Sequence, residues 1–88
     1  MSHRKLTISS DEGLQSRSAA LLVQVAGKFT SNIWIEQGNK RVNAKSIMGV
    51  LSLRLRKGDA FTIAASGSDE ENAVAAISRL IEKGEAGV

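Results

Sequence analysis

The segment between Ser68 and Gly84 carries an apolar stripe at helical spacing, and this stripe constrains the fold more than any other feature. Its apolar residues lie three and four positions apart, which places them on one face of a helix. A helix of this kind must bury that face against a second layer of structure. The Ser68-x-x-Glu71 spacing predicts a capping box at the start, and Gly84 predicts the end. The stripe consists of Ala73, Val74, Ile77, Leu80 and Ile81.

Four short segments with alternating side chains can supply that second layer. Each directs apolar side chains to one face and polar side chains to the other, as a half-buried strand does. In the last of them, Phe61, Ile63 and Ala65 share the apolar face. Between the middle two, Gly38-Asn39 predicts a two-residue hairpin turn. The predicted strands are residues 4–9, 32–37, 40–44 and 60–66.

Two more helices are predicted between the strands. Residues 16–27 repeat small and aliphatic residues on one face, with Ser16 as the N-cap and Gly27 at the end. A shorter helix begins at Ser46 and ends near Leu53. The order strand, helix, strand, strand, helix, strand, helix gives a two-layer α+β fold. We expect residues 1–88 to form one domain.

Composition excludes several classes of function. The chain has no cysteine, which excludes disulfides and thiolate metal sites. It shows no carboxylate pair, metal-ligand cluster or nucleophile–base set, so we expect neither an enzyme nor a bound cofactor or metal. The basic N-terminus is followed by no long apolar segment, and we therefore expect a cytoplasmic protein that does not contact a membrane.

The net charge of +3 is mild, and several of the basic residues form two loose groups along the chain. Nucleic-acid binding needs basic residues on a common surface, often with aromatic residues for stacking, and the chain has one tryptophan and two phenylalanines. We expect no direct nucleic-acid binding, and a small DNA-binding domain stays as an alternative from another class. The groups fit a solvated surface that favours an acidic partner or a phosphate. They are Lys40, Arg41 and Lys45, and Arg54, Arg56 and Lys57.

Ser46 has two interpretations on the sequence alone. As an N-cap, its hydroxyl accepts a hydrogen bond from a backbone N–H one turn into the helix. The same position suits a phosphate, because unpaired N–H groups and the positive end of the helix dipole converge there. Ile47, Met48 and Leu51 follow at helical spacing, as either core or an exposed patch. We expect Leu51 to be mostly buried and the other two to be partly exposed.

Two segments together resemble the histidine-containing phosphocarrier protein HPr of the bacterial sugar phosphotransferase system. Residues 13–20 resemble the active-site loop of that family, and residues 42–53 resemble its regulatory serine segment. The spacing between the segments and the order of elements also fit, so the resemblance covers nearly the whole chain. It implies an HPr-like open-faced β-sandwich, with a four-stranded antiparallel sheet covered on one face by three helices (βαββαβα).

The phosphocarrier histidine of the family would fall at position 15, where this chain has Gln15. An imidazole nitrogen is nucleophilic, whereas the lone pair of an amide nitrogen is delocalised, so Gln15 cannot carry a phosphoryl group. The only histidine, His3, lies near the N-terminus and is expected to be mobile and solvated. Phosphoryl relay should therefore be lost, and the alternative is a phosphocarrier that uses another residue.

Glutamine at this position, together with an intact serine segment, is the pattern of the catabolite repression HPr (Crh) class of bacilli. The resemblance implies that Ser46 is phosphorylated by the bifunctional HPr kinase/phosphorylase. It implies that the phosphoprotein is then a corepressor of catabolite control protein A, a DNA-binding regulator. It further implies that Arg17 contacts the partner and that Ile47, Met48 and Leu51 form an apolar docking patch.

Two residues stand outside these assignments. Ser18 occupies a position where the family usually has proline, and its additional N–H is expected to loosen the first turn of the helix slightly. Trp34 faces away from Ile33 and Ile35, so it is a partner or dimer contact on the uncovered side of the sheet, or it lies under a loop. The sequence leaves open whether the chain forms a homodimer by exchanging its N-terminal strand.

Overall fold

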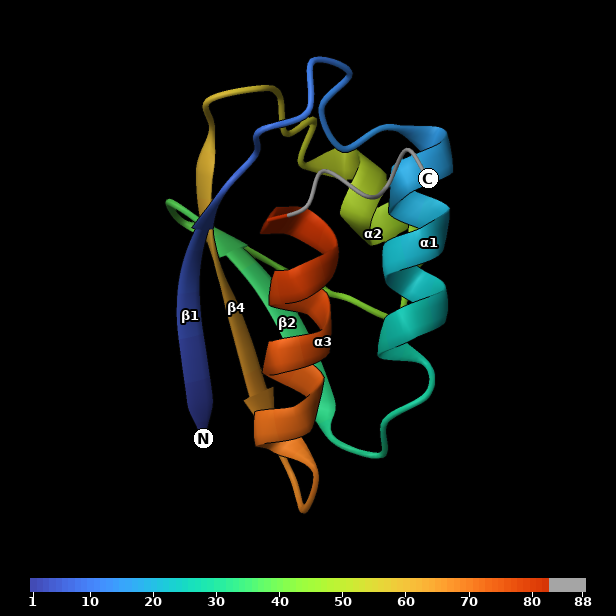
Figure 1. Ribbon diagram of the computed structural model, residues 1–88, viewed down its shortest axis with the longest axis vertical. Helices are drawn as coiled ribbons and strands as arrows, with labels where there is room; N and C mark the ends of the chain where they lie inside the picture. The colour runs from blue at the N-terminus through green and yellow to red at the C-terminus, as the bar shows by residue number, and fades with distance from the viewer. Residues whose placement is uncertain (83–88) are drawn as a thin grey trace.

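Seven elements follow one another in the predicted order in the computed structural model, which describes residues 1–82 and, for Ser16, the backbone alone. Figure 1 shows two long helices and one short helix beside a twisted sheet. The elements are β1 (Ser2–Thr7), α1 (Ser16–Ala26), β2 (Asn32–Gln37), β3 (Lys40–Asn43), α2 (Ile47–Ser52), β4 (Ala60–Ser66) and α3 (Glu70–Glu82).

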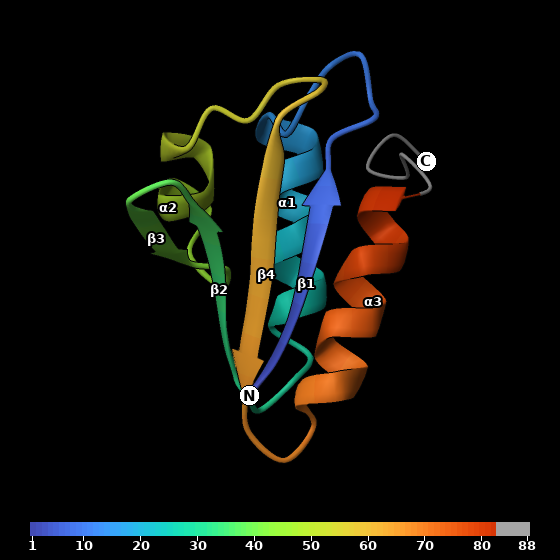
Figure 2. The same ribbon diagram turned by 90° about the vertical axis from the view of Figure 1, so that its left-hand side faces the viewer.

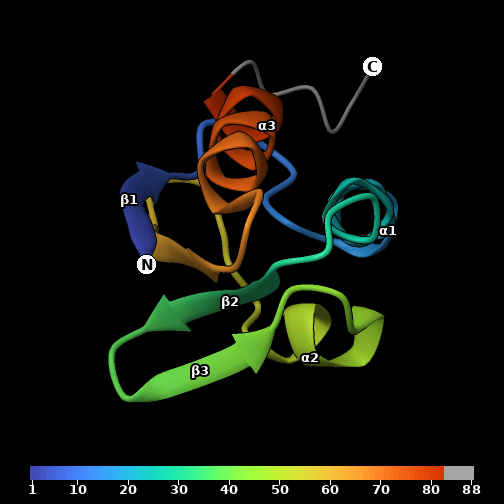
Figure 3. The same ribbon diagram turned by 90° about the horizontal axis from the view of Figure 1, so that it is seen from below.

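The sheet is antiparallel throughout, with the strand order β1-β4-β2-β3. β4 and β2 form its centre, whereas β1 and β3 are edge strands. All three helices lie on the same face of the sheet, and the other face is uncovered (Figures 2 and 3). This arrangement confirms the predicted open-faced sandwich.

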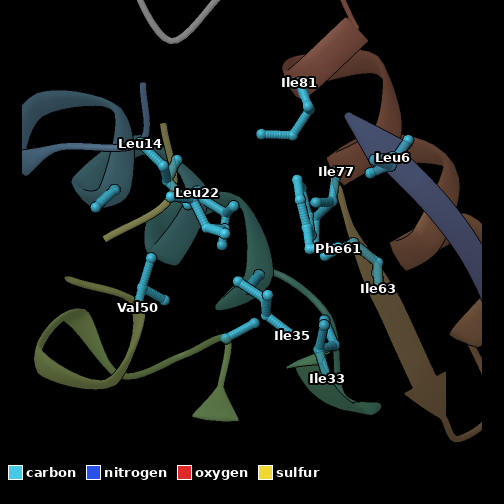
Figure 4. Close-up of a cluster of buried hydrophobic side chains, with 14 of the residues drawn as sticks. Leu6, Leu14, Leu22, Ile33, Ile35, Val50, Phe61, Ile63, Ile77 and Ile81 are labelled. Carbon is cyan, nitrogen blue, oxygen red and sulfur yellow. The ribbon is translucent and has the colours of Figure 1, made fainter. Parts of the chain in front are cut away.

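The core lies between the sheet and the helices. Ile35 of β2 and Ile63 of β4 are directly paired across the two strands and fully buried. Leu22 of α1 and Ile77 of α3 cover them from the helix layer, and all four are fully buried (Figure 4). Complete burial of one such side chain contributes about 1.5–3 kcal/mol, so these contacts fix the position of each helix on the sheet.

The two central strands have the predicted bounds, and the first strand does not. β1 spans Ser2–Thr7 and not residues 4–9, because Ile8 leaves the sheet and exchanges backbone hydrogen bonds with the turn after α2. Its N–H donates to the carbonyl of Asp59, and its carbonyl accepts from Gly58. The earlier start places His3 in β1 opposite Ala64, exposed but held in the strand, so its predicted mobility was wrong.

The starts of the two long helices also differ from the predictions by one position. α1 has Gln15 and not Ser16 as its N-cap, and the N–H of Ala19 donates to the Gln15 carbonyl. In α3 the predicted Ser68–Glu71 pair is replaced by one that lies one residue earlier. The N–H of Gly67 donates to the Glu70 carboxylate over 3.1 Å. The predicted helix end at Gly84 lies outside the described residues.

Trp34 lies on the uncovered face of the sheet and is half-buried. The guanidinium carbon of Arg41 lies 4.1 Å from the centroid of the indole ring, a cation–π contact between β2 and β3. Arg41 also pairs with Glu36, with 3.2 Å between Nε and Oε2. These three side chains stabilise the edge of the sheet through neighbouring strands.

Candidate functional site

Ser46 stands at the start of α2 with an extended backbone conformation, as an N-cap residue does. Its hydroxyl oxygen accepts a hydrogen bond from the N–H of Gly49 over 3.2 Å, and its carbonyl accepts from Val50. The side chain is partly exposed. The cap is therefore local, since both bonds stay within the first turn of a six-residue helix.

The three apolar residues after Ser46 divide between surface and core. Met48 is 74% exposed and Ile47 is 37% exposed, whereas Leu51 is partly buried and packs against the core. Val50 is the residue of α2 that enters the core completely. The predicted division between exposed and buried residues is confirmed, and α2 presents a large unpaired apolar side chain, that of Met48, beside Ser46.

Lys45 fixes the start of α2 on α1. Its ammonium group donates to the carbonyl of Phe29, just after the end of α1, over 2.8 Å. Its backbone N–H donates to the Asn43 side chain, also over 2.8 Å. The positive charge of Lys45 is thus used to position the segment that carries Ser46.

Helices α1 and α2 lie side by side and run in opposite directions (Figure 1). The start of α2 meets the end of α1 through Lys45 and Phe29, whereas the segment after α2 meets the loop before α1. There the N–H of Leu14 donates to the carbonyl of Leu55 over 2.9 Å. Gln15 therefore lies near the end of α2, the helix that Ser46 begins.

Gln15 and Arg17 are both exposed at the start of α1. The amide of Gln15 thus reaches solvent at the position where the resemblance expects a nucleophile. Arg17 lies on the same turn, and no ion pair involving its guanidinium forms within residues 1–82. The structure therefore brings these two residues together at the start of α1.

Ser18 tightens the start of α1, and the predicted loosening was wrong. Its side chain is buried, with 7% exposure. Its hydroxyl oxygen accepts from the N–H of Gln15 over 3.0 Å and lies within hydrogen-bond distance of the carbonyls of Gly13 and Gln15. The serine therefore supplies one half of a reciprocal cap and holds the loop to the helix.

A cleft of about 400 Å³ opens between this loop and the end of α2. Its lining includes Gln15 and Leu51, and it also includes residues that the sequence did not single out as site residues. Arg54 and Arg56 were recognised as part of a basic group with Lys57, but Lys57 pairs instead with Asp11, with 2.7 Å between the charged atoms. The lining consists of Leu14, Gln15, Leu51, Arg54, Leu55 and Arg56.

The most perturbed carboxyl group is that of Asp69, directly before α3, and the starts of α3 and α1 lie at opposite ends of the molecule (Figure 1). Hydrogen bonds from the Ser31 hydroxyl and from the backbone N–H groups of Thr30 and Ser31 lower the pKa of Asp69 to about 2. Asp69 precedes α3 and accepts these bonds from the loop after α1. Its shifted pKa therefore reports a structural link between elements.

The part of the chain that the structure describes contains no group of three His, Asp or Glu side chains that could hold a metal ion. None of its helices has the length and apolar character needed to cross a bilayer.

Comparison with known proteins identifies relatives along almost the entire chain. The family model described as "PTS HPr component phosphorylation site" matches residues 2–83. The HPr-like protein Crh of Halalkalibacterium halodurans is 46% identical over 83 residues, which cover 94% of this chain and 99% of that protein.

Two solved structures extend the comparison to the fold. HPr-C-His from Thermoanaerobacter tengcongensis superposes with a TM-score of 0.93 at 48% identity, covering 96% of this chain and 94% of the other. Crh of Bacillus subtilis superposes with a TM-score of 0.76 at 41% identity, covering 94% and 95%. That Crh structure is described as an intertwined dimer with a swapped domain.

Proposed function

The chain belongs to the HPr family, and we propose that it is a regulatory member that is phosphorylated on Ser46 by HPr kinase/phosphorylase and then acts as a corepressor of catabolite control protein A. Proteins of this family are phosphocarrier or regulatory proteins and not enzymes. The proposal places the chain in the cytoplasm, where it reports on carbon supply to a transcription regulator. It does not relay phosphoryl groups.

The observation that carries the proposal is the pairing of Gln15 with an accessible Ser46. The exposed amide of Gln15 offers no nucleophilic nitrogen, because its lone pair is delocalised into the carbonyl. Ser46 keeps a partly exposed hydroxyl at a helix start. Of the two positions that carry phosphoryl groups in the family, one is chemically silent and the other is intact.

Phosphorylation of Ser46 supplies charge without a change of fold. A phosphoserine carries about −1.5 to −2 charges and new acceptor oxygens. The helix start, with its backbone N–H groups, tolerates that anion. The new charge then stands beside Met48, so a partner arginine or lysine can pair with the phosphate while the partner buries apolar area.

A partner that uses every proposed contact must span α2. Ile47, Met48 and Leu51 lie along this helix, and Arg17 lies at the start of α1. Six helical residues extend about 9 Å, which is well within the width of a protein–protein interface. The proposal is that one partner contacts the docking patch, the phosphate and Arg17 together.

Kinase treatment tests the proposal directly. Incubation with HPr kinase/phosphorylase and ATP, followed by mass analysis, should add one phosphate to the wild type and none to Ser46→Ala. Ser52→Ala is the matched control, because Ser52 is an exposed serine of the same helix whose hydroxyl donates to the Gly49 carbonyl. Ser52→Ala should accept one phosphate. A phosphate that persists on Ser46→Ala would overturn the assignment.

The runner-up is a phosphocarrier that uses another residue, and a second incubation separates the two. With the upstream phosphotransferase and phosphoenolpyruvate, a regulatory protein gains no label. Acid-labile label on the chain would favour the phosphocarrier, because phosphoramidates hydrolyse in acid while phosphoserine persists.

Corepression adds a binding test. The Ser46-phosphorylated chain should bind catabolite control protein A, and the unmodified chain should bind at least about tenfold more weakly, a loss typical of one charge-assisted pair. Met48→Ser should weaken binding of the phosphorylated chain while leaving phosphorylation intact. Equal binding of both forms would contradict a phosphorylation-dependent corepressor.

The proposal includes a homodimer. β1 is an edge strand that contacts β4 along its whole length, so an exchanged copy would find the same partner strand. The swapped dimer described for the Bacillus subtilis relative supports this route. Light scattering over a range of concentrations tests it, and a single monomeric mass at every concentration would contradict it.

A further inference from the structure

The cleft between the loop before α1 and the end of α2 is not explained by phosphorylation at Ser46. It lies at the C-terminal end of α2, whereas Ser46 begins that helix, and it shares one residue, Leu51, with the docking patch. At about 400 Å³ it falls within the range of small-molecule sites, which are concave and about 300–1,000 Å³.

The lining of this cleft divides into an apolar floor and a cationic rim. Leu14 and Leu55 are buried, and Leu51 is partly buried, so they offer an apolar surface. Arg54 and Arg56 are exposed, and within residues 1–82 neither forms an ion pair with a carboxylate. Two guanidinium groups near an apolar floor are suited to a ligand with one anionic end.

The backbone around the cleft is held rigidly. Gly13 has a φ of +71°, and a Cβ on it would lie 2.6 Å from the Leu55 carbonyl oxygen, so two chain segments approach as closely as glycine allows. The bond from Leu14 to Leu55 joins the same segments. The N–H of Arg56 donates to the Asp59 carboxylate over 2.8 Å. The arginines are therefore presented by a preformed wall.

Arg54 occupies a backbone conformation that arginine rarely adopts. Its φ of +51° makes it the sole non-glycine residue with positive φ in the described chain. Arg54 directly follows the C-cap Leu53, where a left-handed residue, usually glycine, commonly ends a helix. The conformation places an arginine directly after α2, at the edge of the cleft.

We propose that this cleft binds a small organic anion with an apolar body and one phosphate or carboxylate group. The leucine floor accepts the apolar body, and Arg54 and Arg56 pair with the anionic end, next to the amide of Gln15. The site does not depend on the phosphorylation state of Ser46. Because Leu51 belongs to both surfaces, the ligand would lie at the border of the docking patch.

Phenyl phosphate is a suitable probe, with inorganic phosphate and phenol as its two halves. Amide chemical shifts of the full chain, followed during titration at constant ionic strength, should saturate at Leu14, Leu55 and Arg56. Either half alone should bind at least about tenfold more weakly, because each loses one class of contact. Benzoate in place of phenyl phosphate distinguishes a carboxylate site from a phosphate site. Equal shifts with inorganic phosphate alone would reduce the site to an ordinary counter-ion surface and overturn the proposal.

Variants separate the two arginines from general basic charge. Arg56→Gln and Arg54→Gly should each weaken phenyl phosphate binding severalfold, whereas Arg4→Gln on β1 should not change it. Ser46→Ala should bind like the wild type, so a failed kinase reaction and a failed ligand titration remain independent results. If Arg4→Gln weakened binding as much as Arg56→Gln, or if Arg56→Gln and Arg54→Gly both bound normally, the site would be wrong.

Discussion

The starts of α2 and α3 use the same kind of local chemistry for opposite purposes. In each, a side-chain oxygen immediately before the helix accepts backbone hydrogen bonds. The Ser46 hydroxyl accepts from Gly49, three residues along the chain. The Asp69 carboxylate accepts from Thr30 and Ser31, which are 39 and 38 positions away. The Ser46 hydrogen bond caps its own helix, whereas the Asp69 hydrogen bonds join the start of α3 to the loop after α1.

The difference shows which helix start can carry a switch. A carboxylate that binds the loop after α1 cannot change without moving that loop. A hydroxyl with one bond inside its own turn can gain a phosphate while the rest of the core stays in place. Under the proposed function, the exposed Met48 beside Ser46 offers a partner an apolar contact.

The largest effect should follow from Gly67→Ala, because the added methyl group crowds Ser31, which binds the Asp69 carboxylate. Gly67 has a φ of +154°, and an added Cβ would lie 2.7 Å from Cα of Ser31. Backbone atoms cannot withdraw as a flexible side-chain end can, so strain and displacement of Ser31 should together cost about 3 kcal/mol. Urea denaturation measures this loss.

Gly38→Ala is the matched control for that change. Gly38 also has a positive φ, +58°, but nothing lies within 4 Å of the added Cβ. It should cost about 1 kcal/mol, the penalty of the left-handed conformation alone. If both variants lost the same stability, the close approach to Ser31 would not matter and the distinction between the two helix starts would weaken.

Asp69→Asn should produce a smaller loss that depends on pH. The pKa of Asp69 is lowered from 3.8 to about 2 in the folded protein, mainly by the Ser31 hydroxyl and the Thr30 N–H. A lowered folded-state pKa means that the ionised form stabilises the fold above pH 3.8 and that this contribution disappears as the pH falls toward 2.

Thermal melts of Asp69→Asn and wild type should therefore differ at pH 7 and converge near pH 2. Ser46→Ala has no titrating group at the altered position, so its difference from wild type should not follow this pattern. If the difference in melting temperature between Asp69→Asn and wild type stayed constant across the acid range, these hydrogen bonds would not be stabilising the ionised form of Asp69.

The fold was predictable because local periodicity and turn signals agreed with the global arrangement. The apolar alternation of β2 and β4 reports one buried face directly, and both strands have the predicted bounds. Helix starts were less predictable, since neighbouring residues can offer the same spacing. Ser68 and Glu71 have the spacing of a capping box, yet Gly67 and Glu70 form the pair, and Glu70 also accepts a hydrogen bond from Ser2 of β1.

The candidate site was predictable in part for the same reason. Helical spacing placed Met48 and Leu51 on one short helix but left core and surface open, and the further expectation of an exposed Met48 and a mostly buried Leu51 was confirmed. The cleft was not predictable, because it depends on a hydrogen bond from the N–H of Leu14 to the carbonyl of Leu55, a residue far away in the sequence.

Ser46→Ala should remove the local cap and cost about 1 kcal/mol, less than Gly67→Ala. The lost bond is the one from Gly49, and the remaining contacts of α2 with the core through Val50 persist. Urea denaturation gives the loss, and amide shifts should change around α2 but not around Thr30 and Ser31. Ser52→Ala, in the same helix, should cost less, because alanine is the better helix former. Equal losses for both serines would mean that Ser46 contributes no cap.

Phosphorylation of Ser46 should give the smallest effect and the opposite sign. The phosphate stands at the start of α2, where an anion gains about 0.3–1 kcal/mol from the helix dipole and backbone N–H groups at low salt. Screening shortens the range of that interaction to roughly 3 Å at 1 M salt, so the gain in melting temperature should shrink as salt is added. Ser46→Asp should show a weaker gain of the same kind. A phosphoprotein that melts below the unmodified chain, or loses amide dispersion outside α2, would show that the modification acts on the fold itself. We expect phosphorylation to leave the fold intact, because the Ser46 hydrogen bond stays within one helical turn, whereas the Asp69 hydrogen bonds join distant segments.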